Sequence, residues 1–365
     1  MGSIGGYRLA SVHTFEVVSR YPRTVGRNAR LGAHGDGPTS TAVAVTTDDG
    51  TTGWGLALGP VEPTRALVGR PIDELIDPSI GVVEGTALPL DYALHDLAGM
   101  ILGLPVHDLL GGAGERVLAC YDGAIYLDDL DVTPDRAVDT VLANCAADHA
   151  AGYRSFKLKI GRGHRWMDGA AGLARDIEVT RAVRAAYPDA DLLADANDGF
   201  TVADALQYLQ AVQDCELFWL EEPFLEDRAD LARLRAFLRD TAAPTLVADG
   251  EARPDVAALL PLAADGLIDV LLMDVVSYGL TAWRKIMPAV LDAGVAASPH
   301  AWGDPLKTLY AAQIGAGLGN VLTVEGVPGT VVGVDTGGYR LESGRLQVPM
   351  TAGFGIPLPD GALPD

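Results

Sequence analysis

The sequence predicts an α/β protein in which a closed barrel of alternating strands and helices follows a smaller α+β domain. From about Ala119 onward, short apolar runs alternate with helical stretches, and this alternation is typical of a parallel sheet. Each apolar run ends in a charged or ionisable residue, and successive ends lie about 23 to 36 residues apart, roughly one βα unit. A chain of 365 residues also exceeds what one hydrophobic core usually serves.

Residues 1–118 carry the signals of the α+β domain. Two β-prone stretches, residues 41–47 and 51–56, flank Asp49-Gly50, which is a hairpin turn signal. Residues 91–102 predict a helix that runs into Gly111-Gly112. The segment 21–38 is rich in Gly, Arg and Asn, and we expect it to form a mobile lid loop.

The barrel is expected over residues 119–335. Thr201 is the expected N-cap of one barrel helix, with Asp204 in the first turn. Seven or eight strand–helix units favour a closed barrel over an open doubly wound sheet, and no GxGxxG motif opens a helix. The tail, residues 336–365, is expected to return to the first domain. Buried barrel strands are expected at residues 192–194, 217–220, 270–273 and 295–297.

Composition narrows the classes of partner. The formal net charge of −22 argues against nucleic acid and against an anionic membrane surface, because both need basic patches. Apolar runs fall short of the roughly 20 residues that span a bilayer. The 3 cysteines are widely spaced and odd in number, so neither a disulfide framework nor a zinc cluster is expected. We therefore expect a cytoplasmic protein that acts on a small molecule.

Three carboxylates end consecutive predicted strands: Asp195, Glu221 and Glu251. Strand C-termini share one face of a barrel, so these groups should converge there. Three carboxylates in one low-dielectric mouth repel each other unless a cation holds them, and all-oxygen ligation suits Mg²⁺, with Mn²⁺ as a substitute. Asp249 should face the same way as Glu251 by strand alternation, and it competes for the third ligand position.

Further ionisable groups end the other strands. Lys157 and Lys159 lie on one side of a buried strand, where a second cation and a metal should lower the pKa of Lys159 and make it a base. Lys157 would then bind the substrate carboxylate. Asp274 and His300 end consecutive strands, so the carboxylate can orient the imidazole. Glu325, at the last strand, could donate or share a proton with the substrate carboxylate.

Longer motifs extend over nearly the whole chain. They include the stretch Leu90 to Gly99 followed by Gly103-Leu104-Pro105 and Leu109 to Gly112. Around the strand ends they are Phe156-Lys157-Leu158-Lys159, Asp195-Ala196-Asn197, Glu221-Glu222-Pro223, Gly250-Glu251, Met273-Asp274 and Ser298-Pro299-His300. With these motifs the sequence resembles the mandelate racemase subgroup of the enolase superfamily, and it is similar to the sugar-acid dehydratases of that subgroup.

The resemblance implies a modified TIM barrel, (β/α)7β, with an N-terminal α+β capping domain that the C-terminal tail completes. It implies Mg²⁺ on Asp195, Glu221 and Glu251. Lys159 and the His300–Asp274 pair would be acid/base catalysts on opposite faces of a carboxylate substrate. Lys157, Asn197 and Glu325 would bind that substrate. We also expect a homo-oligomer.

The step implied by the resemblance is removal of the proton α to a carboxylate, which makes the protein a lyase or an isomerase. The predicted lid carries Arg23, Arg27, Asn28, Arg30 and His34. Such donors suit a polyhydroxylated acid better than an aryl acid, so we favour a sugar-acid dehydratase. A racemase or epimerase and a cycloisomerase remain alternatives, as does, from another class, a Schiff-base aldolase that uses Lys159.

Overall fold

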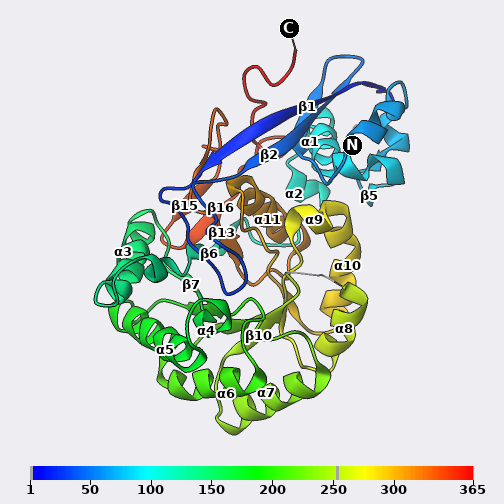
Figure 1. The fold of residues 1–365 in the computed structure, drawn as a ribbon. Helices are drawn as coiled ribbons and strands as arrows, with labels where there is room; N and C mark the ends of the chain where they lie inside the picture. Colours follow the sequence, from blue (N-terminus) through cyan, green and yellow to red (C-terminus); the bar gives the residue numbers. More distant parts are fainter. Residues whose placement is uncertain (1–2, 252–254, 365) are drawn as a thin grey trace.

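The computed structural model describes residues 3–251 and 255–364, and it confirms the predicted fold class. A barrel of parallel strands surrounded by helices forms one part of the molecule, and a smaller α+β domain, the cap, packs against it (Figure 1). The expected strands 192–194, 217–220, 270–273 and 295–297 all fall on barrel strands, although the last three are shorter or shifted by one or two residues.

The cap is an antiparallel sheet in the order β14-β1-β2-β3 with helices against it. Helix α1 packs so closely on β3 that a Cβ at Gly53 would lie 2.2 Å from the backbone nitrogen of Leu97. The cap strands are β1 (Leu9–Arg20), β2 (Thr39–Thr47), β3 (Thr52–Leu56), β4 (Ile76–Asp77) and β5 (Gly81–Val82). Its helices are α1 (Asp91–Leu102), α2 (Val106–Leu109) and the 3-10 turns Glu62–Leu67, Ile72–Glu74 and Gly85–Leu90.

The barrel strands run parallel, and each except the last is followed by a helix in the chain. The strands are β6 (Val117–Ile125), β7 (Phe156–Lys159), β8 (Leu192–Asp195), β9 (Trp219–Glu221), β10 (Leu246–Asp249), β11 (Val270–Leu271), β12 (Ala296–Ala297) and β13 (Val324–Gly326). Strand β13 pairs with β6, and a parallel bridge joins Ala297 to Val321, so the sheet closes.

The helices form the outer ring of the barrel. They are α3 (Ala137–Ala150), α4 (Arg162–Arg165), α5 (Gly169–Ala186), α6 (Val202–Ala211), α7 (Arg228–Asp240), α8 (Val256–Ala264), α9 (Val275–Tyr278), α10 (Leu280–Asp292) and α11 (Pro305–Leu318). Short 3-10 turns occur at Asp128–Asp131 and Gln213–Cys215. The apolar sides of these helices cover the buried strands and make one continuous core. No helix in the described ranges is both long enough and apolar enough to cross a membrane.

The tail contacts both parts of the molecule. Its hairpin, β15 (Arg340–Glu342) and β16 (Arg345–Gln347), extends the sheet antiparallel to β6. Shortly before the tail, β14 (Thr330–Val331) pairs with β1. Further along, the backbone nitrogen of Phe354 donates to Asp96 Oδ1 (2.7 Å), and Trp54 Nε1 donates to the carbonyl of Ile356 (2.9 Å). The C-terminal residues therefore complete the core of the cap.

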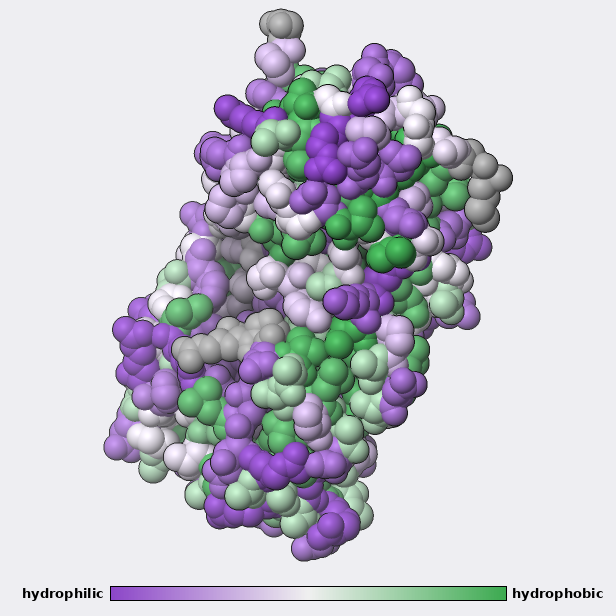
Figure 2. Space-filling view, turned by 90° about the vertical axis from the view of Figure 1, so that its right-hand side faces the viewer, coloured by the Kyte–Doolittle hydropathy of each residue, from purple (hydrophilic) through white to green (hydrophobic). Residues whose placement is uncertain are grey.

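The cap and the barrel also meet directly, along α1 and α10. Tyr92 donates to the carbonyl of Val275 (2.5 Å), and Thr281 donates its hydroxyl to the buried Asp91 (2.6 Å). Hydrophobic residues gather in the middle of the face that Figure 2 shows, and hydrophilic residues dominate above and below them. The hydrogen bonds of Tyr92 and Thr281 hold α9 and α10 of the barrel against the cap.

Helix α6 begins at the residue that the sequence indicates. The Thr201 hydroxyl accepts from the backbone nitrogen of Asp204 (3.2 Å), and the Asp204 carboxylate accepts from the backbone nitrogen of Thr201 (3.1 Å). We expect Thr201→Ala to lower the free energy of unfolding by about 1 kcal/mol, because a helix-terminal N–H loses its acceptor. Urea unfolding should show this loss with an unchanged slope. Thr140→Ala, inside α3, is the control, and it should lower the free energy of unfolding by less than Thr201→Ala does.

Candidate active site

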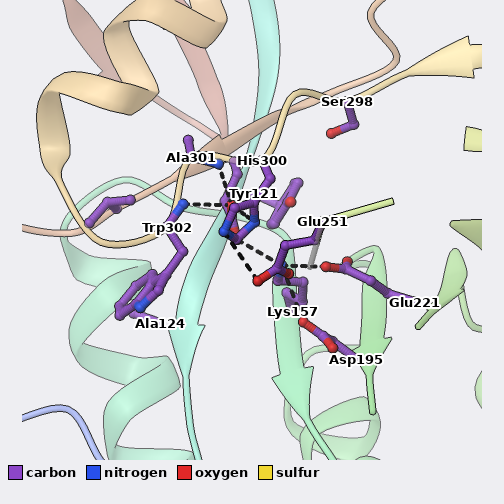
Figure 3. Close-up of polar contacts among 12 residues, drawn as sticks. Tyr121, Ala124, Lys157, Asp195, Glu221, Glu251, Ser298, His300, Ala301 and Trp302 are labelled. Atoms are coloured by element: carbon purple, nitrogen blue, oxygen red, sulfur yellow. Dashed lines mark hydrogen bonds and ion pairs between the residues drawn. The ribbon is translucent and has the colours of Figure 1, made fainter. Parts of the chain in front are cut away.

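The ionisable residues at the strand ends meet in the mouth of the barrel, as Figure 3 shows for several of them. Asp195 is the partner of Lys159 on β7 and of Glu221 on β9 in the sheet register, so three neighbouring strands bring these groups side by side. The Nζ atom of Lys157 then connects the cluster to Glu325 on β13. The cluster holds every predicted site residue that carries a charge: Lys157, Lys159, Asp195, Glu221, Glu251, Asp274, His300 and Glu325.

Lys157 is fully buried and is surrounded by carboxylates. Its Nζ lies 2.8 Å from Glu221 Oε1, 2.7 Å from Glu325 Oε1 and 3.4 Å from Asp195 Oδ2. A buried ammonium is stable only with such partners. In this arrangement Lys157 holds three strand ends together, and its predicted contact with a substrate carboxylate stays a prediction.

Lys159 is buried beside the carboxylates. Burial lowers the pKa of its amine and Lys157 acts in the same direction, but Asp195, Glu251 and Glu221 together raise the pKa above its usual value. Lys159 Nζ donates a hydrogen bond to Asp195 Oδ2. The expected lowering of this pKa requires a metal beside the two lysines, and it stays a prediction. A cation on Asp195 would compete with the ammonium for that oxygen.

Glu325 contacts His300 and accepts hydrogen bonds from the loop that follows His300. Its Oε2 lies 3.0 Å from His300 Nδ1 and accepts from the backbone nitrogens of Ala301 (2.7 Å) and Trp302 (2.9 Å). Burial opposes ionisation of Glu325, but Lys157 and His300 hold its pKa well below the usual range. The predicted donation or sharing of a proton between Glu325 and a substrate carboxylate stays a prediction.

Asp274 lies beside His300 with a looser contact than the sequence suggests. A parallel bridge joins their backbones, yet Asp274 Oδ2 is 4.0 Å from His300 Nε2, which is too long for a hydrogen bond. Asp274 instead caps α9 by accepting from Val276 and Ser277. It also forms an ion pair with Lys307. Burial raises the pKa of Asp274, but Lys307, His300 and the hydrogen bonds to the carboxylate together lower it below its usual value. The short contact that orients the imidazole comes from Glu325.

Glu251 and Asp249 point to different places. Glu251 Oε1 lies 3.3 Å from His300 Nε2, and Glu251 forms with Glu221 and His300 a group whose ligand atoms all lie within 4.8 Å of one another. Asp249 is buried next to Glu226 and Asp198, which raise its pKa after burial itself. Gly250, with φ 108°, turns the chain between them, so strand alternation does not continue to Glu251.

The donor set fits a divalent cation that prefers oxygen. Burial and the neighbouring Asp195 raise the pKa of Glu221 well above its usual value, so the carboxylates carry more negative charge than this pocket stabilises. Glu251 Oε2 and Asn197 Oδ1 are buried, and no described residue hydrogen-bonds either atom. Such oxygens are suitable ligands for Mg²⁺. The group that lies closest together includes His300 instead of Asp195, because Asp195 is paired with the two lysines.

The predicted lid segment, residues 21–38, runs from the cap across the barrel mouth (Figure 1). The Tyr21 hydroxyl donates to the carbonyl of Gly303 (2.7 Å), and Gly26 donates its N–H to Asp128 Oδ1 (2.6 Å). The Trp166 indole donates to the carbonyl of Asn28 (2.7 Å). The lid therefore contacts the loops after β6, β7 and β12, while its mobility stays a prediction.

Several residues of the site were missed in the sequence. Trp219 Nε1 donates to Glu221 Oε2 (3.0 Å), and strand alternation two residues before Glu221 could have found it. Lys157 lies over the Tyr121 ring (5.6 Å) and Lys159 over the Tyr126 ring (5.2 Å). Both tyrosines are on or just after β6, a strand with no charged motif at its end. Lys307 lies on α11, and no motif or spacing in the sequence indicates that it belongs to the site.

Residues 141–362 match the family model described as enolase C-terminal domain-like, which covers more than half of the chain. The chain belongs to the enolase superfamily. Within it, the chain is a member of the mandelate racemase subgroup, as the residue motifs indicate.

Solved structures of this superfamily share the whole fold. A galacturonate dehydratase from Geobacillus sp., complexed with D-galacturonate and 5-keto-4-deoxy-D-galacturonate, has a TM-score of 0.91 at 32% identity, over 98% of this chain and 95% of that one. A mandelate racemase/muconate lactonizing protein from Geobacillus sp. Y412MC10, complexed with magnesium and tartrate, has a TM-score of 0.93 at 32% identity, over 98% and 94%.

A curated relative is the D-galactarolactone cycloisomerase of Agrobacterium fabrum, which is 31% identical over 76% of this chain and 74% of its own length. Other superfamily relatives are dehydratases and epimerases. This superfamily member is therefore an enzyme, a lyase or an isomerase.

Proposed function

We propose that this enzyme removes the proton α to the carboxylate of a sugar acid and then eliminates water from the neighbouring carbon. The observation that carries the proposal is the placement of Lys159 and His300. Lys159 is on β7 and His300 follows β12, so they approach the carboxylate cluster from different sides of a closed barrel. Two acid/base groups so placed can each carry out one proton transfer: one takes the α proton and the other protonates the leaving hydroxyl.

The polar groups around His300 support its part in this reaction. Glu325, held by two backbone N–H groups, contacts Nδ1 and leaves Nε2 on the side of Glu251. The ring is thereby oriented for proton transfer at Nε2. Asp274 and Lys307 carry balancing charges behind it.

We propose that Asp195, Glu221 and Glu251 bind Mg²⁺. When bound, the cation would supply positive charge beside the substrate carboxylate and so stabilise the charge that develops as the α proton leaves. Solved relatives that contain magnesium support this choice. Substitution by Mn²⁺, a homo-oligomer and a cytoplasmic location stay predictions.

The choice of a sugar acid rests on the relatives. A dehydratase of galacturonate shares the fold at 32% identity, and its ligands are a sugar acid and the keto-deoxy acid that loss of water gives. Cycloisomerisation is the second candidate, because a galactarolactone cycloisomerase is 31% identical. A Schiff-base aldolase that uses Lys159 is the alternative from another class, and the relatives named above, which are dehydratases, an epimerase and a cycloisomerase, do not support it.

A screen of mono- and dicarboxylic sugar acids with Mg²⁺ should find at least one that gives a keto-deoxy product. The product should disappear after EDTA treatment and return with added Mg²⁺. Accumulation of an α-epimer or of a rearranged lactone, with no keto product, would instead establish an epimerase or a cycloisomerase. A borohydride-reduced adduct on Lys159 in the presence of a keto acid would favour the aldolase.

A further inference from the structure

The cationic side chains of the lid are already paired with carboxylates of this chain. Each of its arginines forms an ion pair: Arg23 with Asp148 (2.9 Å from Nη1 to Oδ1), Arg27 with Asp131 (2.8 Å) and Arg30 with Asp198 (3.2 Å). Arg162, after β7, is fully buried between Asp129 and Asp176. In the described part of the chain, these guanidinium groups have their charge compensated before any substrate enters.

The lid contributes instead to an aromatic wall beside the catalytic cluster. We define the wall as Tyr21, His34, Tyr126 and Trp302. The ring centroids of Tyr126 and Trp302 are 4.7 Å apart, and those of Tyr21 and Trp302 are 5.4 Å apart. The His34 ring meets Tyr126 edge-on at 4.6 Å, and Tyr126 in turn faces the Nζ atom of Lys159 at 5.2 Å. Through Tyr126 the wall adjoins Lys159, and His34 is its one polar ring.

The hydrogen bonding of His34 fixes its tautomer. Its Nδ1 lies 3.0 Å from the carbonyl oxygen of Gly26, and a carbonyl can only accept, so Nδ1 carries the hydrogen. In the neutral ring, Nε2 is then an acceptor without a hydrogen. No described residue hydrogen-bonds Nε2.

The charge state of His34 agrees with this assignment. Burial lowers the pKa of the ring and Lys159 acts in the same direction, while the hydrogen bond to Gly26 and the Glu251 carboxylate oppose them, and the pKa stays below its usual value. The ring is therefore neutral at pH 7, and its free nitrogen accepts hydrogen bonds.

We propose that Nε2 of His34 accepts a hydrogen bond from a hydroxyl at the end of the substrate distant from the reacting carboxylate, so that the enzyme selects monocarboxylic sugar acids over dicarboxylic ones. The proposal rests on the function proposed above and names its substrate class. A hydroxyl supplies the donor that Nε2 lacks. A carboxylate has no donor, would face a lone pair, and would find no uncompensated guanidinium among the lid arginines.

Matched pairs of acids test the selection, because an aldonate and its aldarate differ only at the distant carbon. D-Galactonate against galactarate and D-gluconate against D-glucarate are two such pairs. For the configuration that the enzyme accepts, kcat/KM for the aldonate should exceed that for the aldarate by about tenfold or more, the cost of one unmet buried polar group. Equal or better turnover of the aldarate overturns the proposal.

His34→Phe keeps the ring and its edge contacts but removes the acceptor. It should lower kcat/KM for the aldonate by about 10- to 100-fold, with no comparable loss for the aldarate. His13→Phe, the same change on the cap strand β1, is the control and should leave both values unchanged. If His34→Phe discriminates between the two acids as wild type does, His34 does not select the substrate and the proposal fails.

Failure of the proposed function has a different signature. No acid would then give keto product, and calorimetric binding of the same pairs to wild type and to His34→Phe would decide the inference. Tighter binding of the aldonate, lost in the variant, supports it. Equal or tighter binding of the aldarate overturns it.

Discussion

Replacing Lys159 by methionine should lower product formation by at least about 100-fold and should also stop exchange of the substrate α proton with deuterated solvent. Lys159 is almost fully buried beside Asp195, and no other described amine is placed to act from β7 except Lys157, which is held by three carboxylates. Methionine preserves most of the volume of the side chain. Loss of rate with unchanged thermal stability would therefore report the missing amine.

His300→Asn separates the two proton transfers. If Lys159 takes the α proton and His300 protonates the leaving group, this variant should stop product formation and still permit exchange. If instead the Lys159 variant permits exchange and His300→Asn stops it, His300 takes the α proton and Lys159 protonates the leaving group. The substrate would then have the opposite stereochemistry. Exchange of only one of two α-epimers in each variant, with no keto product in wild type, would show an epimerase. Turnover close to wild type in both variants would falsify the assignment of these catalytic residues.

Removing one carboxylate of the proposed metal site should weaken Mg²⁺ binding more than the roughly 10- to 100-fold that loss of an outer-shell partner costs. Glu251→Gln is the most informative change, because Glu251 lies between Glu221 and His300 and has one buried oxygen without a described hydrogen-bond partner. Calorimetric titration of Mg²⁺ measures the loss, and circular dichroism checks that the fold is intact.

Asp249→Asn is the matched control for the metal site. Asp249 is two residues from Glu251 and equally acidic, but its neighbours are Glu226 and Asp198. We expect Mg²⁺ affinity in this variant to change much less than in Glu251→Gln. Full affinity and activity in Glu251→Gln, together with their loss in Asp249→Asn, would make Asp249 the third ligand.

Much of the fold follows from local patterns in the sequence. The helix predicted over residues 91–102 has these bounds in the structure, and Thr201 caps α6 through the expected Asp204. Strand positions followed from apolar runs, with strand ends displaced by one or two residues. The convergence of charged groups followed from one rule, that strand C-termini of a barrel share a face.

The parts that could not be predicted depend on tertiary contacts. Gly250 adopts a positive φ, which cancels the alternation that placed Asp249 beside Glu251. The pKa of Lys159 depends on the balance between burial, Lys157 and the surrounding carboxylates, and the short contact of His300 is with Glu325, which two backbone N–H groups of the next loop hold in place. Lys307 reaches Asp274 from a helix whose rotation no local pattern fixes.

The cap has a consequence for biosynthesis, because segments far apart in the sequence build it. The hydrogen-bond partners of Trp54 and Asp96, at Ile356 and Phe354, are synthesised much later than Trp54 and Asp96 themselves. At roughly 5–20 residues per second, the stretch of about 300 residues between Leu56 and Ile356 takes on the order of 15–60 s to translate. During that interval the nascent cap lacks part of its interior, so it is a natural client for a chaperone. A chain that ends before Phe354 would lack the same part of the cap interior, and we expect proteases to degrade it faster than the full chain.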